Sequence, residues 1–356
     1  MALALSLGAR GLGRVWPNPA VGCVIVKDGR IVGRGSTADG GRPHAETVAL
    51  EQAGAGAQGA TAYVTLEPCA HHGKTPPCAD ALVAAGIARV VTALEDPDPR
   101  VAGKGHAVLQ QAGLQVVTGV GRDGAKQSHS GFLQRLKFGR PMLTLKLASS
   151  FDGRIATASG ESQWITGPQA RRMVHLLRAR HDAVLVGGGT ARKDDPMLTV
   201  RGLGRMRQPV RIVATRQLDL PLGGKLAASA NKVPVWICHG QDADPALLSV
   251  WQGLGAKLMP CETRQAKLAP DSILQALGAA GLTRVFCEGG GGFAASLLKA
   301  GLVDEVVCFS AGLAIGAEGV AALGVMGVNR LAAAPRFELA DCRPVGGDVM
   351  QIWRRV

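Results

Sequence analysis

Three residues near the start of the chain have the types that bind a transition metal: His44, Cys69 and Cys78. They stand in the patterns His44-Ala45-Glu46 and Pro68-Cys69, and the second cysteine follows nine positions after the first. One imidazole and two thiolates are a common ligand set for catalytic zinc, and they leave the fourth tetrahedral position open for water. This combination predicts a hydrolytic zinc centre.

Glu46 is expected to handle protons rather than bind the ion. On a regular helix its side chain lies about 200° away from that of His44, so both would not readily bind one ion. Zinc lowers the pKa of a bound water to about 7. Glu46 can then take that proton, activate the water for attack on an amino-bearing ring carbon, and pass the proton to the departing ammonia. A structural zinc with His71 or His72 as its fourth ligand is the alternative.

The elements that must position these residues alternate between strand and helix signals, as in an α/β layer. Strand signals cover 21–26, 62–66, 90–94 and 115–118, and helix signals cover 44–53, 78–85 and 105–112. We therefore expect Cys69 to end a strand, Cys78 to open a helix, and His44 to lie on the first turn of another. Helix N-termini favour the thiolate form that metals need.

Residues 121–140 are polar and weakly periodic, so we place a junction at 123–140 between a first domain, 1–122, and a second domain, 141–356. A second α/β series follows it, with strand signals over 142–147, 183–186, 210–214, 233–238, 284–287 and 305–309 and helix signals over 169–180 and 292–300. The glycine-rich segments 187–190 and 289–292 follow strand signals and could bring backbone amides to a phosphate. With 49 glycines in 356 residues, ordinary turns are the alternative.

Composition restricts the class of partner. The formal net charge of +13 favours anionic partners, including phosphorylated small molecules. Aromatic residues make up only 4% of the chain, which disfavours binding of single-stranded nucleic acid because such binders use stacking rings. No secretory signal and no apolar stretch of about 18 residues is found, so we expect a cytoplasmic protein with reduced thiols and no membrane partner.

At motif level the chain resembles the RibD family of bacterial bifunctional riboflavin-biosynthesis proteins. In the first half the resemblance rests on P-N-P at 17–19, H-A-E at 44–46, T-L-E-P-C at 65–69 and H-H-G-K-T-P-P-C at 71–78. In the second half it rests on K-L-A-S-S-F-D-G-R at 146–154, S-G-E-S-Q-W-I-T at 159–166, D-D-P-M-L-T-V-R at 194–201 and E-G-G at 288–290. The gap of eight residues between the two cysteines, in place of the two of P-C-x-x-C deaminases, looks like this family's form of the motif.

The resemblance implies a cytidine-deaminase-like domain followed by a dihydrofolate-reductase-like domain, both of α/β class. It implies a zinc-dependent deaminase that acts on 2,5-diamino-6-(5-phosphoribosylamino)pyrimidin-4(3H)-one. An NADPH-dependent reductase then converts the ribosyl group of 5-amino-6-(5-phosphoribosylamino)uracil to ribityl. We expect phosphorylated pyrimidines as substrates, no nucleic-acid partner, and a homo-oligomer. The alternatives are a deaminase with an inactive reductase half and a nucleic-acid deaminase.

Individual residues receive expected roles. Asn18, between two prolines, is suited to hold a pyrimidine edge, and His71 and Lys74 lie in the basic insert between the cysteines. The resemblance assigns to NADPH the residues Ala148, Trp164, Thr190, Asp194, Gly290, Gly291, Gly292, Phe293, Ala294, Ala295 and Ser296. It assigns to the reductase substrate Lys146, Ser162, Arg178, Leu198, Arg201 and Glu288, and the two arginines suit a phosphate through their planar donor forks.

Each of these roles has a structural alternative. Asn18 can be a turn residue, and the basic insert can be a solvated loop. Lys146 lies in an apolar strand, where its charge needs a partner that can be a structural carboxylate. Asp194 and Asp195 can be a turn pair before Pro196. Arg178 can be a cation on a helix face near its C-terminus.

Overall fold

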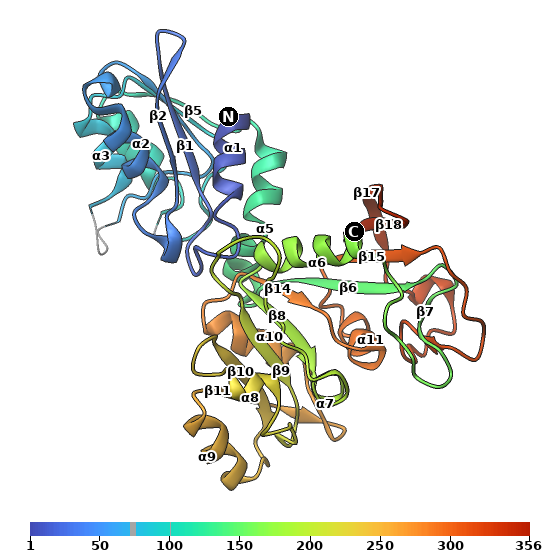
Figure 1. Ribbon diagram of the computed structural model, residues 1–356. Coiled ribbons are helices and arrows are strands. Elements are labelled where there is room, and N and C mark those ends of the chain that lie inside the picture. Colours follow the sequence, from blue (N-terminus) through green and yellow to red (C-terminus); the bar gives the residue numbers. More distant parts are fainter. Residues whose placement is uncertain (72–75, 100) are drawn as a thin grey trace. The chain divides into compact units, whose positions relative to one another are not determined.

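The computed structural model describes residues 1–71, 76–99 and 101–356, and the chain forms two compact units, Met1–Gly139 and Arg140–Val356 (Figure 1). Each unit is built around its own sheet. The expected α/β class is confirmed for both. Among the helices of these described residues, none combines the length and apolar character needed to cross a membrane.

The sheet of the first unit has five strands in the order β2-β1-β3-β4-β5. They are β1 (Gly22–Lys27), β2 (Arg30–Ser36), β3 (Thr61–Val64), β4 (Arg89–Thr92) and β5 (Gln115–Val117). β1 runs antiparallel to both β2 and β3, whereas β3, β4 and β5 are parallel. The parallel strands β3, β4 and β5 end at one edge of the sheet, where we expect the metal ligands His44, Cys69 and Cys78.

Helices cover both faces of this sheet. α2 (Ala45–Ala53), α3 (Cys78–Ala84) and α4 (Lys104–Gln111) bury apolar side chains against one face, and α1 (Ala2–Ala9) packs against β1. The 3-10 turns are η1 (Asp39–Gly41) and η2 (Gly54–Ala57). α2 lies so close to β2 that a Cβ on Gly33 or Gly35 would stand 2.2 Å or 2.0 Å from a helix carbonyl oxygen. The absence of side chains at these two glycines therefore allows α2, the helix that follows His44, to pack directly on β2.

Helix α5 (Arg122–Phe138) fills most of the segment for which the sequence predicts a junction, 123–140. It belongs to the first unit and contacts α1 (Figure 1). Ala125, His129, Phe132 and Leu136 follow helical spacing along it, and His129 places its Nε2 atom 3.2 Å from the Thr65 hydroxyl. His129 stands where the inward face of α5 would otherwise have an apolar residue. The hydrophobic periodicity of the segment is weak for that reason.

The sheet of the second unit has nine strands in the order β11-β10-β9-β8-β14-β6-β15-β18-β17. Seven are mutually parallel: β6 (Met142–Ser150), β8 (Ala183–Gly187), β9 (Val210–Ala214), β10 (Val235–Gly240), β11 (Lys257–Cys261), β14 (Arg284–Cys287) and β15 (Glu305–Ala311). The hairpin of β17 (Phe337–Val345) and β18 (Asp348–Arg355) joins β15 antiparallel. β8, β9 and β10 are buried throughout, as expected of parallel strands covered on both faces.

The helices of the second unit are α6 (Pro168–Ala179), α7 (Gly188–Asp194), α8 (Lys225–Ala228), α9 (Pro245–Gly253), α10 (Pro270–Ala279) and α11 (Gly291–Lys299), with a 3-10 turn η3 (Leu331–Ala333). Two small ribbons complete it, β7 (Arg154–Ala156) with β16 (Val320–Ala321) and β12 (Thr263–Arg264) with β13 (Lys267–Leu268). α7 follows β8 directly and α11 follows β14 after a short glycine segment, and β8 and β14 are neighbours in the sheet. Their two helix N-termini therefore lie at the same edge.

Candidate functional site

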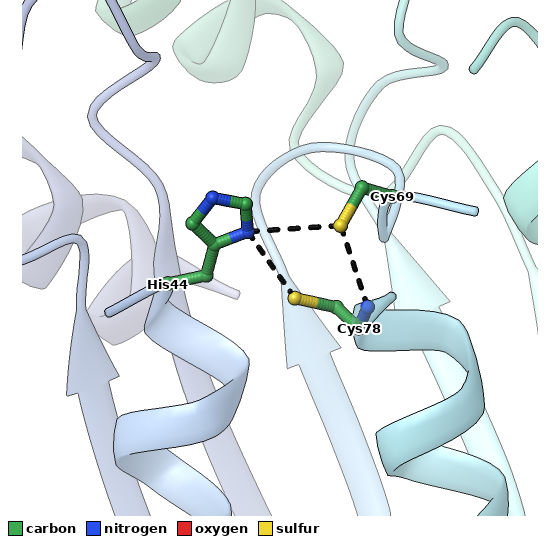
Figure 2. Close-up of side chains that lie close together, drawn as sticks. All are labelled: His44, Cys69 and Cys78. Carbon is green, nitrogen blue, oxygen red and sulfur yellow. Dashed lines mark hydrogen bonds between the residues drawn. The ribbon is translucent and has the colours of Figure 1, made fainter. Parts of the chain in front are cut away.

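The structure brings the side chains of His44, Cys69 and Cys78 together in the first unit (Figure 2). The Nδ1 atom of His44 lies 3.3 Å from Sγ of Cys78 and 3.6 Å from Sγ of Cys69. The backbone N–H of Cys78 donates to Sγ of Cys69 over 3.3 Å. One nitrogen and two sulfurs thus face a common point.

The local backbone differs in two places from the sequence expectation. β3 ends at Val64, so Cys69 lies in the loop after the strand rather than at its end. His44 caps α2 with extended backbone (ψ 161°) and does not lie on its first turn. The wide separation expected on a regular helix therefore does not apply, and His44 and Glu46 line the same pocket. Cys78 opens α3 as expected.

The two thiols share one negative charge. A hydrogen bond from the Cys78 thiol, with further support from His44, lowers the pKa of Cys69 to about 4. The same hydrogen bond, together with burial, raises the pKa of Cys78 far above its ordinary value. The hydrogen bond with Cys69 raises the pKa of His44. Cys69 is thus held as a thiolate, and a metal ion that binds here displaces the proton on Cys78.

Glu46 is a buried carboxylic acid beside this group, with 4% of its surface exposed. Burial, and then the charge of Cys69, raise its pKa to about 7. A carboxyl group with this pKa can both accept and release a proton near neutral pH.

His44, Glu46 and Cys69 line a pocket of about 330 Å³. Asn18 and His71, both expected at the substrate, line it. The side-chain amide of Asn18 donates to the carbonyl oxygen of Gly41 over 2.8 Å, which fixes its orientation. Lys74 lies outside the described residues.

The pocket also contains residues that the sequence reasoning missed. Arg42 precedes the H-A-E motif, and Asp96 and Asp98 follow β4. Phe132, Arg135 and Leu136 come from α5. The helical spacing of residues 125, 129, 132 and 136 was the signal that could have indicated α5. No sequence signal indicated Arg42.

In the second unit, Lys146 of β6, Arg178 of α6 and Glu288 at the end of β14 form a charged cluster. Nε of Arg178 lies 2.5 Å from Oε1 of Glu288, and only 12% and 11% of the two side chains are exposed. Burial disfavours the charged form of Glu288, but Arg178 and Lys146 outweigh it and hold its pKa below the ordinary value. Burial lowers the pKa of Lys146, and Glu288 partly offsets that shift.

The same helix holds the segment that carries Leu198 and Arg201. Nη1 of Arg178 donates to the carbonyl oxygen of Thr199 over 2.9 Å, and the N–H of Arg201 donates to Nδ1 of His175 over 3.2 Å. Leu198 has φ +53° and is 3% exposed, so its side chain lies in the core rather than in an open cleft.

Three further predicted residues divide between the sheet and an exposed segment. Ala148 is half-buried on β6 and packs against the small core beneath α6. Ser162 and Trp164 lie in the exposed segment between β7 and α6. Trp164 is 68% exposed, and its ring lies 4.5 Å from the guanidinium of Arg171. Within the described part of the chain, no hydrogen bond joins Ser162 to the charged cluster.

The two glycine segments meet at the edge formed by β8 and β14. The N–H of Gly290 donates to the Thr190 hydroxyl over 3.1 Å. α11 begins at Gly291, one residue before the start of the helix signal over 292–300, and a Cβ on Gly292 would meet nothing within 4 Å. Ala294 and Ala295 are buried, and the hydroxyl of Ser296 donates to the carbonyl oxygen of Phe293. An anion could therefore approach the backbone at 290–292.

The acidic pair after α7 divides between two environments. Asp194 is the exposed last residue of the helix. Asp195 accepts from the N–H of Lys225 over 2.8 Å, a structural contact of the kind expected of a turn residue. Arg192 forms an ion pair of 2.8 Å with Asp219.

Comparison with known proteins supports both units. Residues 1–94 match the cytidine and deoxycytidylate deaminase zinc-binding region, and residues 141–351 match the RibD C-terminal domain. The riboflavin biosynthesis protein RibD of Escherichia coli K12 is 44% identical over 361 aligned residues, which cover 98% of this chain and 96% of that protein. RibD of Aquifex aeolicus is 39% identical over 355 residues, covering 100% and 97%.

Solved structures give the same result. Form 1 of RibD from Acinetobacter baumannii has a TM-score of 0.88 and 40% identity, with 100% of this chain and 97% of that chain covered. A diaminohydroxyphosphoribosylaminopyrimidine deaminase/5-amino-6-(5-phosphoribosylamino)uracil reductase from Thermotoga maritima has a TM-score of 0.86 and 34% identity over the same shares of the chains. This chain therefore belongs to the RibD family of bifunctional riboflavin biosynthesis proteins, with a cytidine-deaminase-like N-terminal domain and a C-terminal reductase domain.

Proposed function

We propose that the first unit removes the 2-amino group of 2,5-diamino-6-(5-phosphoribosylamino)pyrimidin-4(3H)-one by hydrolysis. The second unit then reduces the ribosyl group of the product, 5-amino-6-(5-phosphoribosylamino)uracil, to ribityl with NADPH. The observation that carries this proposal is the convergence of His44, Cys69 and Cys78 on one point, beside Glu46 in the same pocket.

The donor set fits a catalytic zinc ion. Nδ1 of His44 and the two sulfurs are borderline-soft ligands of the types that zinc prefers. Among the described residues, no further histidine, cysteine or carboxylate joins these three as a fourth ligand, and His71 is not a member of the group. His72, the other residue considered as a fourth ligand, lies outside the described residues. Three protein ligands leave a position for water, which favours a catalytic site over a structural one. Zinc, when bound, supplies a water of lowered pKa at neutral pH.

Glu46 manages the protons of the reaction. Its carboxylate accepts a proton from the attacking water and delivers it to the amino nitrogen, which leaves as ammonia while the ring carbon keeps the oxygen. Burial is the largest cause of the raised pKa of Glu46, and a carboxylate in such a place takes up a proton more readily than an exposed one. Burial of Glu46 keeps bulk water from competing for that proton.

The rest of the pocket recognises the substrate. Asn18, held by the Gly41 carbonyl, presents its amide to the pyrimidine, with His71 on the same wall. Arg42 and Arg135 line the pocket from two different elements, and their guanidinium groups bind the 5-phosphate. Helix α5 is therefore part of the deaminase and not a linker.

In the second unit, the cluster of Lys146, Arg178 and Glu288 holds the sugar, and Arg201 contacts its phosphate. The residues fit NADPH at the start of α11, where Gly291 and Gly292 follow the cap residue Gly290, because backbone N–H groups at a helix start bind phosphate. The N–H of Gly290 donates to the Thr190 hydroxyl and holds the two glycine segments together. Gly292 has open space where a side chain would stand. NADPH, when bound, supplies the hydride. The roles of Asp194, Trp164, Ala148 and Ser162 stay predictions, as do a homo-oligomeric state and a cytoplasmic location.

The test compares Glu46→Gln with Glu51→Gln, an exposed glutamate on the same helix. Purified full chains are assayed for zinc content, ammonia release from the phosphorylated diaminopyrimidine, and NADPH oxidation with the deaminated product. We expect Glu46→Gln to keep zinc and reduction but to lose deamination by roughly a thousandfold, whereas Glu51→Gln matches the wild type. Substantial ammonia release by Glu46→Gln would refute the proton role.

A further inference from the structure

Glu67 is a buried carboxylate that none of the steps above uses. It stands two positions before Cys69, and its side chain has 0% exposure. Its Oε2 atom accepts the N–H of Asp96 over 3.1 Å and the N–H of Gly103 over 3.0 Å. Its Oε1 atom accepts the N–H of His106 over 3.1 Å. Three backbone groups of one distant segment thus converge on a single side chain.

The segment that Glu67 holds forms a wall of the deaminase pocket. Asp96, Asp98 and Val101 all line that pocket. Inside the segment, the N–H of Asp98 donates to Oδ1 of Asp96 over 2.9 Å, and the N–H of Val101 donates to the Asp98 carbonyl oxygen over 2.8 Å. Asp98 therefore bonds to residues on both sides of it, and Asp96 and Gly103 are both attached to Glu67.

Glu67 also caps the helix that follows this loop. α4 begins after Gly103, which has no side chain to satisfy the first N–H groups of the helix. Glu67 accepts from the N–H of the cap residue and from that of His106 in the first turn, and a negative charge there is favourable. A Cβ on Gly105 would stand 2.0 Å from the Pro68 carbonyl oxygen, so α4 packs directly on the turn that leads to Cys69.

A second metal site is the competing interpretation, because donor atoms of Glu67, Glu95 and His106 lie within 4.8 Å of one another. Both oxygens of Glu67 already accept backbone hydrogen bonds, and Nε2 of His106 lies 2.9 Å from the Thr92 hydroxyl. These groups are satisfied by the protein itself. Glu95, the third residue of the group, is exposed to solvent.

We propose that Glu67 is a positioning residue of the deaminase, which ties the turn carrying Cys69 to residues 96–99 and 101–103 and so fixes the pocket wall relative to the metal ligands. This inference rests on the proposed function of the first unit. Glu67 also lines the pocket, but backbone N–H groups occupy both of its carboxylate oxygens, so it acts through the segment that it holds and not on the reacting atoms. Its loss therefore weakens substrate binding more than it slows the chemical step, and it leaves the metal ligands in place.

The experiment compares Glu67→Gln with Glu95→Gln in the full chain. Glutamine keeps the shape but turns one acceptor oxygen into a donor that faces backbone N–H groups. Zinc per chain, KM and kcat for ammonia release, and NADPH oxidation by the second unit are measured. Gly105→Ala is a second variant, because its Cβ would stand 2.0 Å from the Pro68 carbonyl oxygen and 3.1 Å from Oε1 of Glu67, and so disturbs the same contact from the side of α4 while the carboxylate is kept.

We expect Glu67→Gln to raise KM for the diaminopyrimidine about tenfold and to change kcat less than about threefold, with zinc and reduction unchanged. Gly105→Ala should shift KM in the same direction, and Glu95→Gln should match the wild type. An unchanged KM in Glu67→Gln, a loss of zinc or of kcat alone, or an equal effect of Glu95→Gln would each overturn the proposal. A wild-type chain that releases no ammonia would instead refute the proposed function.

Discussion

The two active sites of this chain are assembled from different kinds of sequence information. In the deaminase unit, His44 and Cys78 stand 34 positions apart, and an imidazole together with thiols indicates metal binding by residue type alone. In the reductase unit, Arg178 and Glu288 stand 110 positions apart, and neither residue type is specific to a reaction. Metal ligation restricts residues to a few types, whereas a cleft for a sugar phosphate and a cofactor uses ordinary charges and backbone groups. The first kind of site can be selected from residue types and spacing. The residues of the second were selected only through the family resemblance, and the contact between Arg178 and Glu288 shows that two of them meet.

The sharpest way to break this comparison is to remove one metal ligand. Cys69→Ala should abolish zinc binding and lower ammonia release by at least about a thousandfold, because the ion and its water are lost together. NADPH oxidation with the deaminated product should stay at the wild-type rate, since the reductase residues lie in the other unit. Cys342→Ala, at an exposed cysteine, is the control. Retained zinc in Cys69→Ala would contradict the assigned ligand set.

The second prediction concerns the buried ion pair of the reductase. Arg178→Ala should lower the free energy of unfolding of the second unit by about 3 kcal/mol, because Glu288 keeps its charge in a buried place without its partner. Reduction should fall by roughly a hundredfold.

Arg264→Ala, which removes the exposed ion pairs to Glu262 and Asp271, should cost less than about 1 kcal/mol. Chemical denaturation and NADPH oxidation measure both variants. Equal losses of stability would mean that burial does not distinguish the two arginines.

The third prediction uses a buried histidine next to the reductase cluster. Burial and the nearby Arg284 lower the pKa of His181 to about 3, whereas an unfolded histidine titrates near 6.5. Below a pH of about 6.5, the histidine is protonated in the unfolded chain but stays neutral in the folded one. The free energy of unfolding therefore falls as the pH drops from about 6.5 toward 3.

When the pH is lowered from 7.5 to 5.0, His181 should lower the free energy of unfolding of the second unit by on the order of 2 kcal/mol. Denaturation curves of the wild type and His181→Gln at both pH values measure the difference. An identical pH dependence in the two proteins would show that His181 is not the group responsible.

The smallest expected effect concerns the backbone of the cofactor site. Gly292→Ala should raise KM for NADPH about fivefold, because the methyl group takes space at the start of α11 that the cofactor needs. Its stability should not fall, since a Cβ at this position meets no other atom.

Gly253→Ala is the matched control, at another helical glycine with open space around it. An unchanged KM in Gly292→Ala would move the cofactor away from this helix start and would weaken the contrast between the two units.

The elements that the sequence predicts best are the buried parallel strands. The apolar runs over 210–214 and 284–287 coincide with β9 and β14. Helix α5 escaped prediction because His129 stands in its buried stripe, where its partner is the hydroxyl of Thr65. Only tertiary structure reveals that a polar residue has such a partner, so local periodicity understates a helix of this kind.

The candidate site divides in the same way. His44, Cys69, Cys78 and Glu46 could be selected from residue types and spacing. Arg135 could not, since its role depends on where α5 packs. Glu67 is adjacent to a predicted ligand, yet its importance comes from backbone N–H groups of residues 96, 103 and 106, which carry no sequence signal.

Elemental analysis of the full chain before and after chelation, with both activities measured on the same samples, tests the central claim most directly. We predict about one zinc ion per chain, loss of ammonia release but not of NADPH oxidation when zinc is removed, and recovery of ammonia release when zinc is returned. A metal-free chain that still deaminates, or chelation that abolishes both activities alike, would contradict it.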